Sequence, residues 1–474
     1  MSDGPVAAVV LAAGEGKRLR SSLPKVLHPA AGRPLLAHAL DALSKLDLVK
    51  RIVVVSAGRG EIESAMAAHG HDDGLGYVVQ DPPRGTGDAV KVALDAIGEV
   101  EHVLVTFGDA PLIKGATLRK LLDEHRSSGV GASVLSAMAP PGSDGGRIIR
   151  DDDGAFLRIV EAKDASQEEL DVREINTGFC VFRADLLRTM LDRLEPSNAQ
   201  GEFYLTDVFE MMCEENAGVL ATVGDWSEGQ GVNDRVHLAE AAQVLRARVA
   251  ERWMREGVTI VDPSSTFIDA TVTLQPDATI LPFTFLEGAT SIARGATVGP
   301  QSRIVDSEIG ERAEVTYSVV RESYVGPDAS VGPFASLRPG TRLESGAKLG
   351  TFVESKNTVL GKDSKANHLS YLGDAEIGER VNVGAGTITC NWDGKDKHKT
   401  IIKDDAYISS DTMLVAPLTI GTGAATGAGS VVRDDVPDGA LAVGVPARIL
   451  EGKGDRIAPA KDSTGTGNAD ALDS

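Results

Sequence analysis

The sequence predicts two domains of different architecture: an α/β domain followed by a parallel β-helix. Residues 1–228 alternate continuous apolar runs with helical patterns, which is typical of a sheet covered by helices on both faces. After residue 257, aliphatic residues recur every six positions, as in Ile268, Leu274 and Ile280, which indicates stacked hexapeptide coils. A chain of 474 residues is also too long for one ordinary hydrophobic core.

Apolar runs and helical spacing place the elements of the first domain. Strands are expected at 6–12, 52–55, 103–107 and 178–182, and helices at 35–46 and 89–97. From residue 233 to 256, apolar residues follow helical spacing and Gly257 comes next as a stop, so one long helix is expected there. We therefore expect a first domain at 1–228 and a linker at 229–256.

The six-residue period predicts a β-helix over 257–451. Aliphatic residues occupy every sixth position from Ile268 to Ile304, then from Val325 to Leu349 after a phase shift, and again from Ile402 to Val432, with Thr426 in one slot. A β-sandwich is the alternative, but it needs a period of two over longer runs. The period is expected to break near 364–372 and at 391–400, the second being a polar, projecting loop. Residues 452–474 are rich in small and polar residues and are expected to be disordered.

Composition narrows the partners and the compartment. A formal net charge of −21 repels nucleic acid and anionic membranes, so neither is expected as a partner. A phosphate-bearing ligand then has to be held by a few cations, backbone N–H groups and a metal. The three cysteines, Cys180, Cys213 and Cys390, lie far apart, and the N-terminus lacks a basic leader, so a reducing cytoplasm is expected.

A glycine-rich turn follows the first expected strand. Gly14 and Gly16 allow the backbone to approach a phosphate closely, and Arg18 and Lys25 supply positive charge to a triphosphate. Taken alone, these residues also fit an ordinary strand-to-helix turn with two solvated cations. The segment, however, resembles the LxxGxGxRxxxxxPK signature of the sugar-nucleotide pyrophosphorylases, and further matches follow in order along the chain.

This resemblance implies a set of ligands in the first domain. The residues implied to bind UTP and its product are Leu11, Ala12, Ala13, Gly14, Lys25, Gln80, Gly85, Thr86, Phe107, Gly108 and Asp109. Gly146, Glu161 and Asn176 are implied to contact N-acetylglucosamine, and Asp109 and Asn233 to hold Mg²⁺, which suits a site that borrows waters and phosphate ligands. From the residues alone, Asp109 could instead cap a strand end and Asn233 a helix N-terminus.

The implied reaction is in-line attack of a sugar 1-phosphate oxygen on the α-phosphorus of UTP, with release of pyrophosphate. No protein nucleophile is needed, because positioning and charge neutralisation are sufficient. Arg18, Lys25 and Mg²⁺ are assigned the neutralising role.

The β-helix carries a second motif. A hexapeptide β-helix fits an acyltransferase or a zinc protein, but His368, His398 and Cys390 are the only histidines and cysteine beyond residue 240, which does not make an obvious zinc site. Residues 365–374 resemble the KxxHLxYLGD segment of glucosamine-1-phosphate acetyltransferases. The resemblance implies that His368 is a general base, with Glu354 nearby to orient it.

The same resemblance implies the other acetyltransferase contacts. Arg338 and Lys356 are expected on the sugar phosphate, and Tyr371 and Asn382 on the sugar. The residues expected to line an acetyl-CoA groove are Ala385, Asn391, Trp392, Ser410 and Ala428.

Both halves together resemble the bifunctional N-acetylglucosamine-1-phosphate uridylyltransferase/glucosamine-1-phosphate acetyltransferase family. This implies a Rossmann-like nucleotidyltransferase domain, a left-handed β-helix, a homotrimer with acetyltransferase sites between β-helices, and a role in peptidoglycan synthesis. The alternatives are a sugar-1-phosphate nucleotidyltransferase with a purely structural or regulatory β-helix, and a non-enzymatic exchange scaffold. The His368 motif argues against the first, and the intact Gly14, Arg18, Lys25 and Asp109 against the second.

Several positions depart from the family pattern. They are Lys17, Asp88, Gly145, Asp234 and Trp392, where Thr, His, Tyr, Asn and Tyr are usual. Val445 also stands where some members place an arginine for the CoA phosphates, and Arg448 is a candidate substitute.

Overall fold

The computed structural model describes residues 4–14, 16–57, 59–143, 145–196, 198 and 200–453. The chain divides into two compact units, Met1–Leu245 and Arg246–Ser474, and the division falls within a single helix, α8 (Arg235–Arg255). The tail expected to be disordered lies outside the described residues from position 454 onward.

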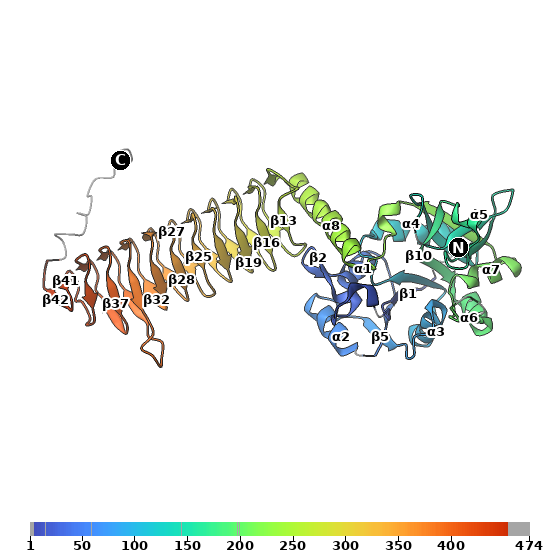
Figure 1. Ribbon diagram of the computed structural model, residues 1–474, viewed down its shortest axis with the longest axis horizontal. Coiled ribbons are helices and arrows are strands. Elements are labelled where there is room, and N and C mark those ends of the chain that lie inside the picture. The colour runs from blue at the N-terminus through green and yellow to red at the C-terminus, as the bar shows by residue number, and fades with distance from the viewer. Residues whose placement is uncertain are drawn as a thin grey trace. The chain divides into compact units, whose positions relative to one another are not determined.

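The first unit is built on a mixed nine-stranded sheet (Figure 1). Its main path runs through β11 (Val219–Gly224), β7 (Ala132–Met138), β10 (Glu174–Arg183), β6 (His102–Phe107), β1 (Val6–Leu11), β4 (Lys50–Val55) and β5 (Leu75–Val79), with β8 (Arg147–Arg150) and β9 (Phe156–Val160) off this path. β10 is antiparallel to both of its neighbours, whereas β1 pairs in parallel with β4 and β6. All four expected strands are confirmed.

Helices cover both faces of this sheet, as the continuous apolar strands predicted. They are α1 (Leu35–Leu43), α2 (Arg59–Ala68), α3 (Thr86–Ile97), α4 (Gly115–Ser128), α5 (Gln167–Leu170), α6 (Ala184–Arg193) and α7 (Asp207–Glu214). Every residue of β1 is buried, and alternate residues serve different cores: Val9 packs with α3, α6 and α7, and Val10 with α1, α2 and α4. Successive side chains of a strand point to opposite faces of the sheet, so a strand with an apolar layer on each face must be apolar throughout.

The register of the sheet places the first site. Leu11 at the end of β1 pairs with Phe107 at the end of β6, so the loops that follow these parallel strands leave the sheet side by side. Ligands of open α/β sheets bind at the carboxyl ends of the strands. The glycine-rich turn and Asp109 therefore share one edge of the sheet.

The second unit is a left-handed parallel β-helix of very short strands (Figure 1). Its first sheet runs from β12 (Thr259–Ile260) to β42 (Ala447–Leu450), its second from β13 (Phe267–Ile268) to β40 (Val431–Val432), and its third from β14 (Thr273–Leu274) to β38 (Leu418–Ile420). Inward aliphatics such as Ile268, Leu286 and Ile304 stack in register and are fully buried. The hexapeptide prediction is confirmed.

Two details of the period differ from expectation. The phase shift arises because some coil sides hold five residues, as from Ile304 to Ile309, while inward positions stay filled. The expected break at 364–372 is wrong: β30 (Lys365–His368) and β31 (Tyr371–Gly373) continue the coils, and Ala366 fills the inward slot. The pattern was missed because alanine stands where Ile, Leu or Val was sought. The 391–400 segment does leave the coil.

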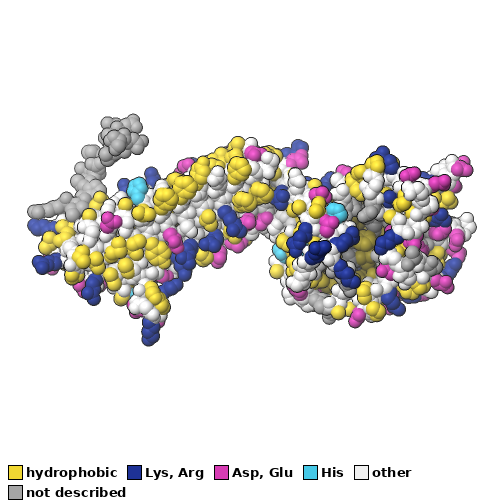
Figure 2. All heavy atoms as spheres, viewed as in Figure 1, with side chains coloured by type: hydrophobic (Ala, Val, Ile, Leu, Met, Phe, Trp, Pro, Cys, Tyr) yellow, Lys and Arg dark blue, Asp and Glu magenta, His cyan; other side chains and the backbone are white. Residues whose placement is uncertain are grey.

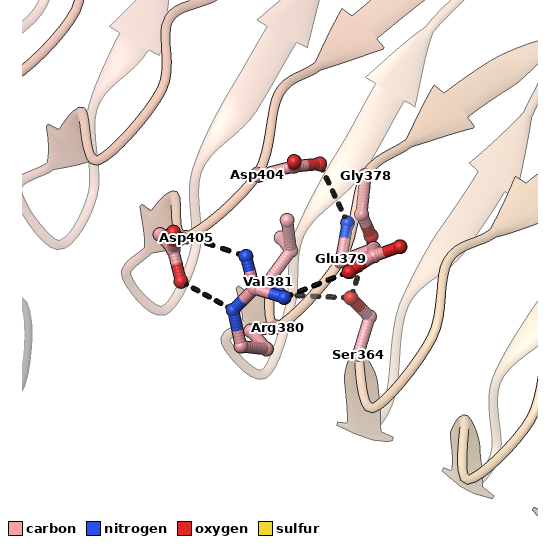
Figure 3. Close-up of polar contacts among 7 residues, drawn as sticks. All are labelled: Ser364, Gly378, Glu379, Arg380, Val381, Asp404 and Asp405. Atoms are coloured by element: carbon pink, nitrogen blue, oxygen red, sulfur yellow. Dashed lines mark hydrogen bonds and ion pairs between the residues drawn. The ribbon is translucent and has the colours of Figure 1, made fainter. Parts of the chain in front are cut away.

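The three corners of the β-helix have different chemistry. At the corner between the first and second sheets, left-handed backbone is adopted by exposed apolar residues, namely Phe283, Tyr317, Phe334, Phe352 and Leu369. Figure 2 shows hydrophobic side chains gathered in bands along this unit. At the corner between the third and first sheets, ion pairs join successive coils, including Arg380 Nε to Asp405 Oδ1 at 2.8 Å (Figure 3). At the third corner, acidic and amide residues such as Asp374 and Asn357 predominate.

Candidate active sites

A cavity of about 580 Å³ opens at the carboxyl ends of β1 and β6. Most of the predicted nucleotide residues line it: Leu11, Ala13, Gly14, Arg18, Lys25, Gln80, Gly85, Thr86, Phe107, Asp109 and Asn233. Ala12 and Gly108 are not on its wall; Ala12 is buried, and the Gly108 N–H donates to the Leu11 carbonyl at 2.9 Å. These two residues shape the strand ends behind the cavity.

Three predicted residues converge inside this cavity. Lys25 Nζ donates to Asn233 Oδ1 at 3.1 Å and forms an ion pair with Asp109 Oδ2. One carboxylate oxygen and one amide oxygen thus face the same cationic group, which is a donor set that also suits a hard cation such as Mg²⁺. Within the described residues no group of three or more His, Cys, Asp or Glu side chains is arranged to hold a metal ion.

The interpretation of Asn233 as a helix cap is wrong. The cap is Asp234, whose Oδ1 accepts the backbone N–H groups of Val236 and His237 at 2.9 Å each. An aspartate suits this place because its negative charge interacts favourably with the helix N-terminus. The cap at Asp234 leaves the Asn233 side chain directed to Lys25.

The glycine-rich turn depends on the backbone freedom of Gly16. This residue has φ of +63°, and a Cβ there would lie 2.7 Å from Lys25 Cβ. A larger residue would be strained and would displace Lys25. The conformation of Gly16 therefore helps to fix the position of Lys25 at the cavity.

The loop expected to read uracil is held from two sides. Buried Gln80 donates through Nε2 to the Gly85 carbonyl at 3.0 Å and to Asp88 Oδ2 at 2.8 Å. Arg84 donates to the other Asp88 oxygen at 2.8 Å, so the departure at position 88 gives the loop an anchor. Because the amide nitrogen of Gln80 is bound by the protein, its oxygen remains for a ligand.

The three residues expected on the sugar are neighbours, although they do not share one cavity wall. The Asn176 N–H donates to the Gly146 carbonyl at 2.8 Å, and a Cβ on Gly146 would lie 3.4 Å from Glu161 Oε1. Asn176 faces a cavity of about 460 Å³ that also includes Asn233, whereas Glu161 faces another of about 640 Å³. Burial raises the pKa of the Glu161 carboxyl.

In the β-helix, His368 belongs to a vertical column of side chains. The ladder registers of the first sheet align exposed His368 with Ala385, Ser410 and Ala428 on successive coils. Neighbouring parallel strands are about 4.8 Å apart, so the column rises in even steps from the histidine. Three of the residues expected to contact acetyl-CoA thus follow the expected base along one line.

The residues expected on the sugar phosphate gather on the second sheet. Arg338 Nη1 forms an ion pair with Glu354 Oε1 at 2.7 Å, and Glu354 pairs in register with Tyr371. On β28 (Glu354–Lys356), the neighbouring Lys397 ammonium lowers the pKa of Lys356. Adjacent cations of this kind are suited to an anionic ligand.

Within the described part of the second unit, the expected acetyltransferase residues do not converge. Asn382 begins β33 (Asn382–Val383) in the first sheet, whereas Tyr371 and Lys356 belong to the second. Asn391 and Trp392 open the projecting loop that follows β34 (Ile388–Cys390), beyond the far edge of the second sheet. The set is therefore divided between two faces of the β-helix.

Three further residues lie at these sites. Glu202 lines the first cavity, Lys397 lies beside Lys356, and Asp374 holds Asn391. Glu202 and Lys397 lie in loops, where no periodic pattern in the sequence could have identified them. Asp374 is the last residue of the KxxHLxYLGD segment, so this motif was the only sequence feature that could have drawn attention to it.

Comparisons with known proteins settle the family. Residues 8–200 match the MobA-like NTP transferase domain. The chain is 46% identical to the bifunctional protein GlmU of Desulfitobacterium hafniense (strain Y51), over 92% of this chain and 95% of that protein. It is 48% identical to the same-named protein of Thermobifida fusca (strain YX), over 96% and 95%.

The chain belongs to the GlmU family. Membership confirms the predicted resemblance and, with it, a bifunctional enzyme that makes UDP-N-acetylglucosamine. A purely structural β-helix and a non-enzymatic scaffold are therefore not supported. In this GlmU family member, none of the described helices is both long and apolar enough to cross a membrane.

Proposed function

We propose that the first unit transfers uridylyl groups in the cavity around Lys25, Asp109 and Asn233, and that the second transfers acetyl groups at the His368 column. The observation that supports the first assignment is the convergence of these three side chains beside the glycine-rich turn. The alignment of His368 with Ala385, Ser410 and Ala428 supports the second.

In uridylyl transfer, the protein's task is to hold two anions in line. Lys25 and Arg18 line the cavity and neutralise charge that develops on the α-phosphate and the leaving pyrophosphate. Asp109 and Asn233 would hold Mg²⁺, which would supply further neutralisation of the phosphate charge. Gly146, Glu161 and Asn176 orient the N-acetylglucosamine, and the sugar phosphate oxygen forms the new P–O bond as the bond to pyrophosphate breaks.

In acetyl transfer, the sugar amine attacks the thioester carbonyl of acetyl-CoA. The C–N bond forms and the C–S bond breaks, while His368 accepts the amine proton and returns it to the departing CoA thiolate. Arg338 and Lys356 bind the sugar phosphate, and Tyr371 and Asn382 bind the sugar. Cys390 has its pKa raised by burial, which makes a thiolate acyl carrier unfavourable and favours direct transfer.

The column of small residues gives the acetyl-CoA arm a path. From His368 through Ala385, Ser410 and Ala428 to Gly444 there are four steps, or about 19 Å at about 4.8 Å each. The pantetheine arm spans roughly 16 Å from sulfur to phosphorus at about 1.2 Å of advance per bond, as in an extended peptide. Arg448 pairs with Val443 in the terminal hairpin, next to Gly444 at the end of this path, which supports its assignment to the CoA phosphates.

The division of the acetyltransferase residues between two faces favours a homotrimer. A second copy that packs its first sheet near the second sheet of its neighbour brings both groups of residues to one site. The exposed apolar corner, which includes Phe334 (56% exposed) and Phe352 (60% exposed), is suited to burial between copies. A cytoplasmic enzyme follows from the substrates.

A coupled assay tests the proposal. Purified protein is incubated with glucosamine 1-phosphate, acetyl-CoA, UTP and Mg²⁺, and UDP-N-acetylglucosamine is measured by mass spectrometry. Each unit is inactivated in turn by Asp109→Ala or His368→Ala. Loss of both steps in either variant would contradict the assignment of one reaction to each unit.

A further inference from the structure

Asp374 lies at the corner between the second and third sheets and uses both carboxylate oxygens. Its Oδ1 accepts a hydrogen bond from Asn357 Nδ2 at 2.7 Å, and its Oδ2 accepts one from Asn391 Nδ2 at 2.5 Å. Asn391 is 8% exposed, so this contact is largely shielded from water. Hydrogen bonds to an ionised carboxylate are stronger than those between neutral groups.

The backbone of Asp374 makes two more contacts at the same place. Its N–H donates to the Lys356 carbonyl at 3.0 Å, and its carbonyl accepts the Thr400 N–H at 3.1 Å. Asn391 begins the projecting loop and Thr400 ends it. Asp374 therefore holds both ends of the loop and joins them to a strand that carries an expected phosphate ligand.

The chemistry of the contact fixes the orientation of Asn391. A carboxylate only accepts hydrogen bonds, so Asn391 must turn its NH₂ group to Asp374. Its amide oxygen is then left as an acceptor. The pantetheine arm of acetyl-CoA carries two secondary amides, each with one N–H donor.

We infer that Asp374 is a positioning residue for acetyl-CoA, which acts by presenting the Asn391 amide oxygen to an N–H of the pantetheine arm. This inference rests on the proposed assignment of Asn391 to the acetyl-CoA groove. It adds a residue that touches neither the substrate nor the reacting atoms, yet sets the affinity for the acyl donor.

The test is a double-mutant cycle on the full-length protein with Asp374→Asn, Asn391→Ala and the double variant. Asparagine is suited to position 374 because it tolerates the left-handed backbone there, where φ is +50°. It keeps one acceptor oxygen but turns a donor toward one of the two asparagines. We expect Asp374→Asn and Asn391→Ala each to raise the KM for acetyl-CoA about tenfold, with kcat and the KM for glucosamine 1-phosphate little changed.

The double variant distinguishes positioning from a merely structural role. If Asp374 acts through Asn391, adding Asp374→Asn to Asn391→Ala raises the KM no further. Asn357→Gly is the matched control, because it removes the other hydrogen bond to Asp374, suits the local φ of +47°, and leaves Asn391 held. The control should keep the wild-type KM for acetyl-CoA.

Each outcome decides a separate point. An unchanged KM in Asn391→Ala would overturn the proposed role of Asn391 itself. A raised KM in Asn391→Ala with none in Asp374→Asn would overturn the inference alone. Additive effects in the double variant, or an equal effect of Asn357→Gly, would show that Asp374 only stabilises the corner.

Discussion

Lys25 Nζ lies 3.1 Å from Asn233 Oδ1, although the two residues are 208 positions apart in the chain. Lys25 follows the glycine-rich turn near the N-terminus, and Asn233 immediately precedes the Asp234 cap of α8. The contact makes the start of this helix part of the first unit's cavity. A cation that binds Asn233 Oδ1 and Asp109 Oδ2 would meet the Lys25 ammonium at the same two oxygens.

Truncation should show that this contact matters. A fragment of residues 1–245 is expected to retain uridylyl transfer, because it matches the compact first unit and includes Asn233. A fragment of residues 1–228 should bind Mg²⁺ more weakly and lose most of its activity. Mg²⁺ titration of the rate of pyrophosphate release measures both fragments, and equal activity in the two would contradict a role for Asn233.

Asp109→Ala should abolish uridylyl transfer and leave acetyl transfer near the wild-type rate. The carboxylate is the one negatively charged oxygen ligand proposed for Mg²⁺, and the acetyl reaction makes no use of that ion. Separate assays of pyrophosphate and free thiol measure the two reactions. Asp95→Asn serves as a control for loss of an exposed carboxylate outside the ion site. Equal loss of both activities in Asp109→Ala would indicate misfolding.

His368→Ala should lower acetyl transfer by about 10²- to 10⁴-fold while uridylyl transfer is unaffected. Part of the loss should recover as the pH rises, because the sugar amine then loses its proton without the base. A pH–rate profile of the variant measures this. Mass spectrometry after incubation with acetyl-CoA alone should find no acetyl adduct on Cys390, and a stable adduct there would contradict direct transfer.

Arg448→Ala should raise the KM for acetyl-CoA several-fold and leave the KM for S-acetylpantetheine unchanged, since the shorter donor lacks the CoA phosphates. Arg433→Ala is the matched control, because Arg433 follows the last strand of the second sheet, away from the His368 column. Steady-state kinetics with both donors provide the measurement. An equal effect of Arg448→Ala on the two donors would argue against a phosphate contact.

The first unit should lose stability as the pH falls from 6.5 toward 4. Burial is the main cause that lowers the pKa of His125 from 6.5 to about 4. Between these two pH values the imidazole is protonated in the unfolded chain and neutral in the folded chain, which favours unfolding. The loss from this group is about 3 kcal/mol over that window and is complete near its folded pKa. Denaturant unfolding at several pH values should show a flatter pH dependence of the free energy of unfolding for His125→Gln than for the wild-type protein, and an equal dependence in the two would contradict the prediction.

The parts of the fold with a strict period could be predicted from the sequence. The inward positions of a β-helix accept few kinds of side chain, so the regular spacing of Ile268, Leu286 and Ile304 was enough to predict the stacked coils. Where Ala366 fills the same slot, the pattern fades while the coil continues. In the first unit, the two-sided burial of β1 made its residues uniformly apolar and therefore recognisable.

The site was predictable as a set of residues and less so as an arrangement. Motif resemblance identified Lys25, Asp109 and Asn233, but not that Lys25 bridges the other two. The placement of Asn382 and Tyr371 on different sheets follows from coil register, which small insertions change without leaving a periodic signal. The role of Asp374 depends on its hydrogen bond to Asn391 in the next coil, and the sequence around Asp374 does not indicate which residue this partner is.

Successive residues of the His368 column are separated by one constant distance, the spacing between neighbouring strands of the β-helix. Substrate reach along the column changes in whole coils, because removing one complete side of a coil would move every later side chain to a different sheet. Deleting one complete coil between His368 and Gly444 would shorten the path by about 4.8 Å and leave the chemistry at the histidine intact. The length of the acyl donor that fits along the column and the chemistry at His368 can therefore change independently in this fold. An acyl donor with a shorter arm could be accommodated by such a deletion.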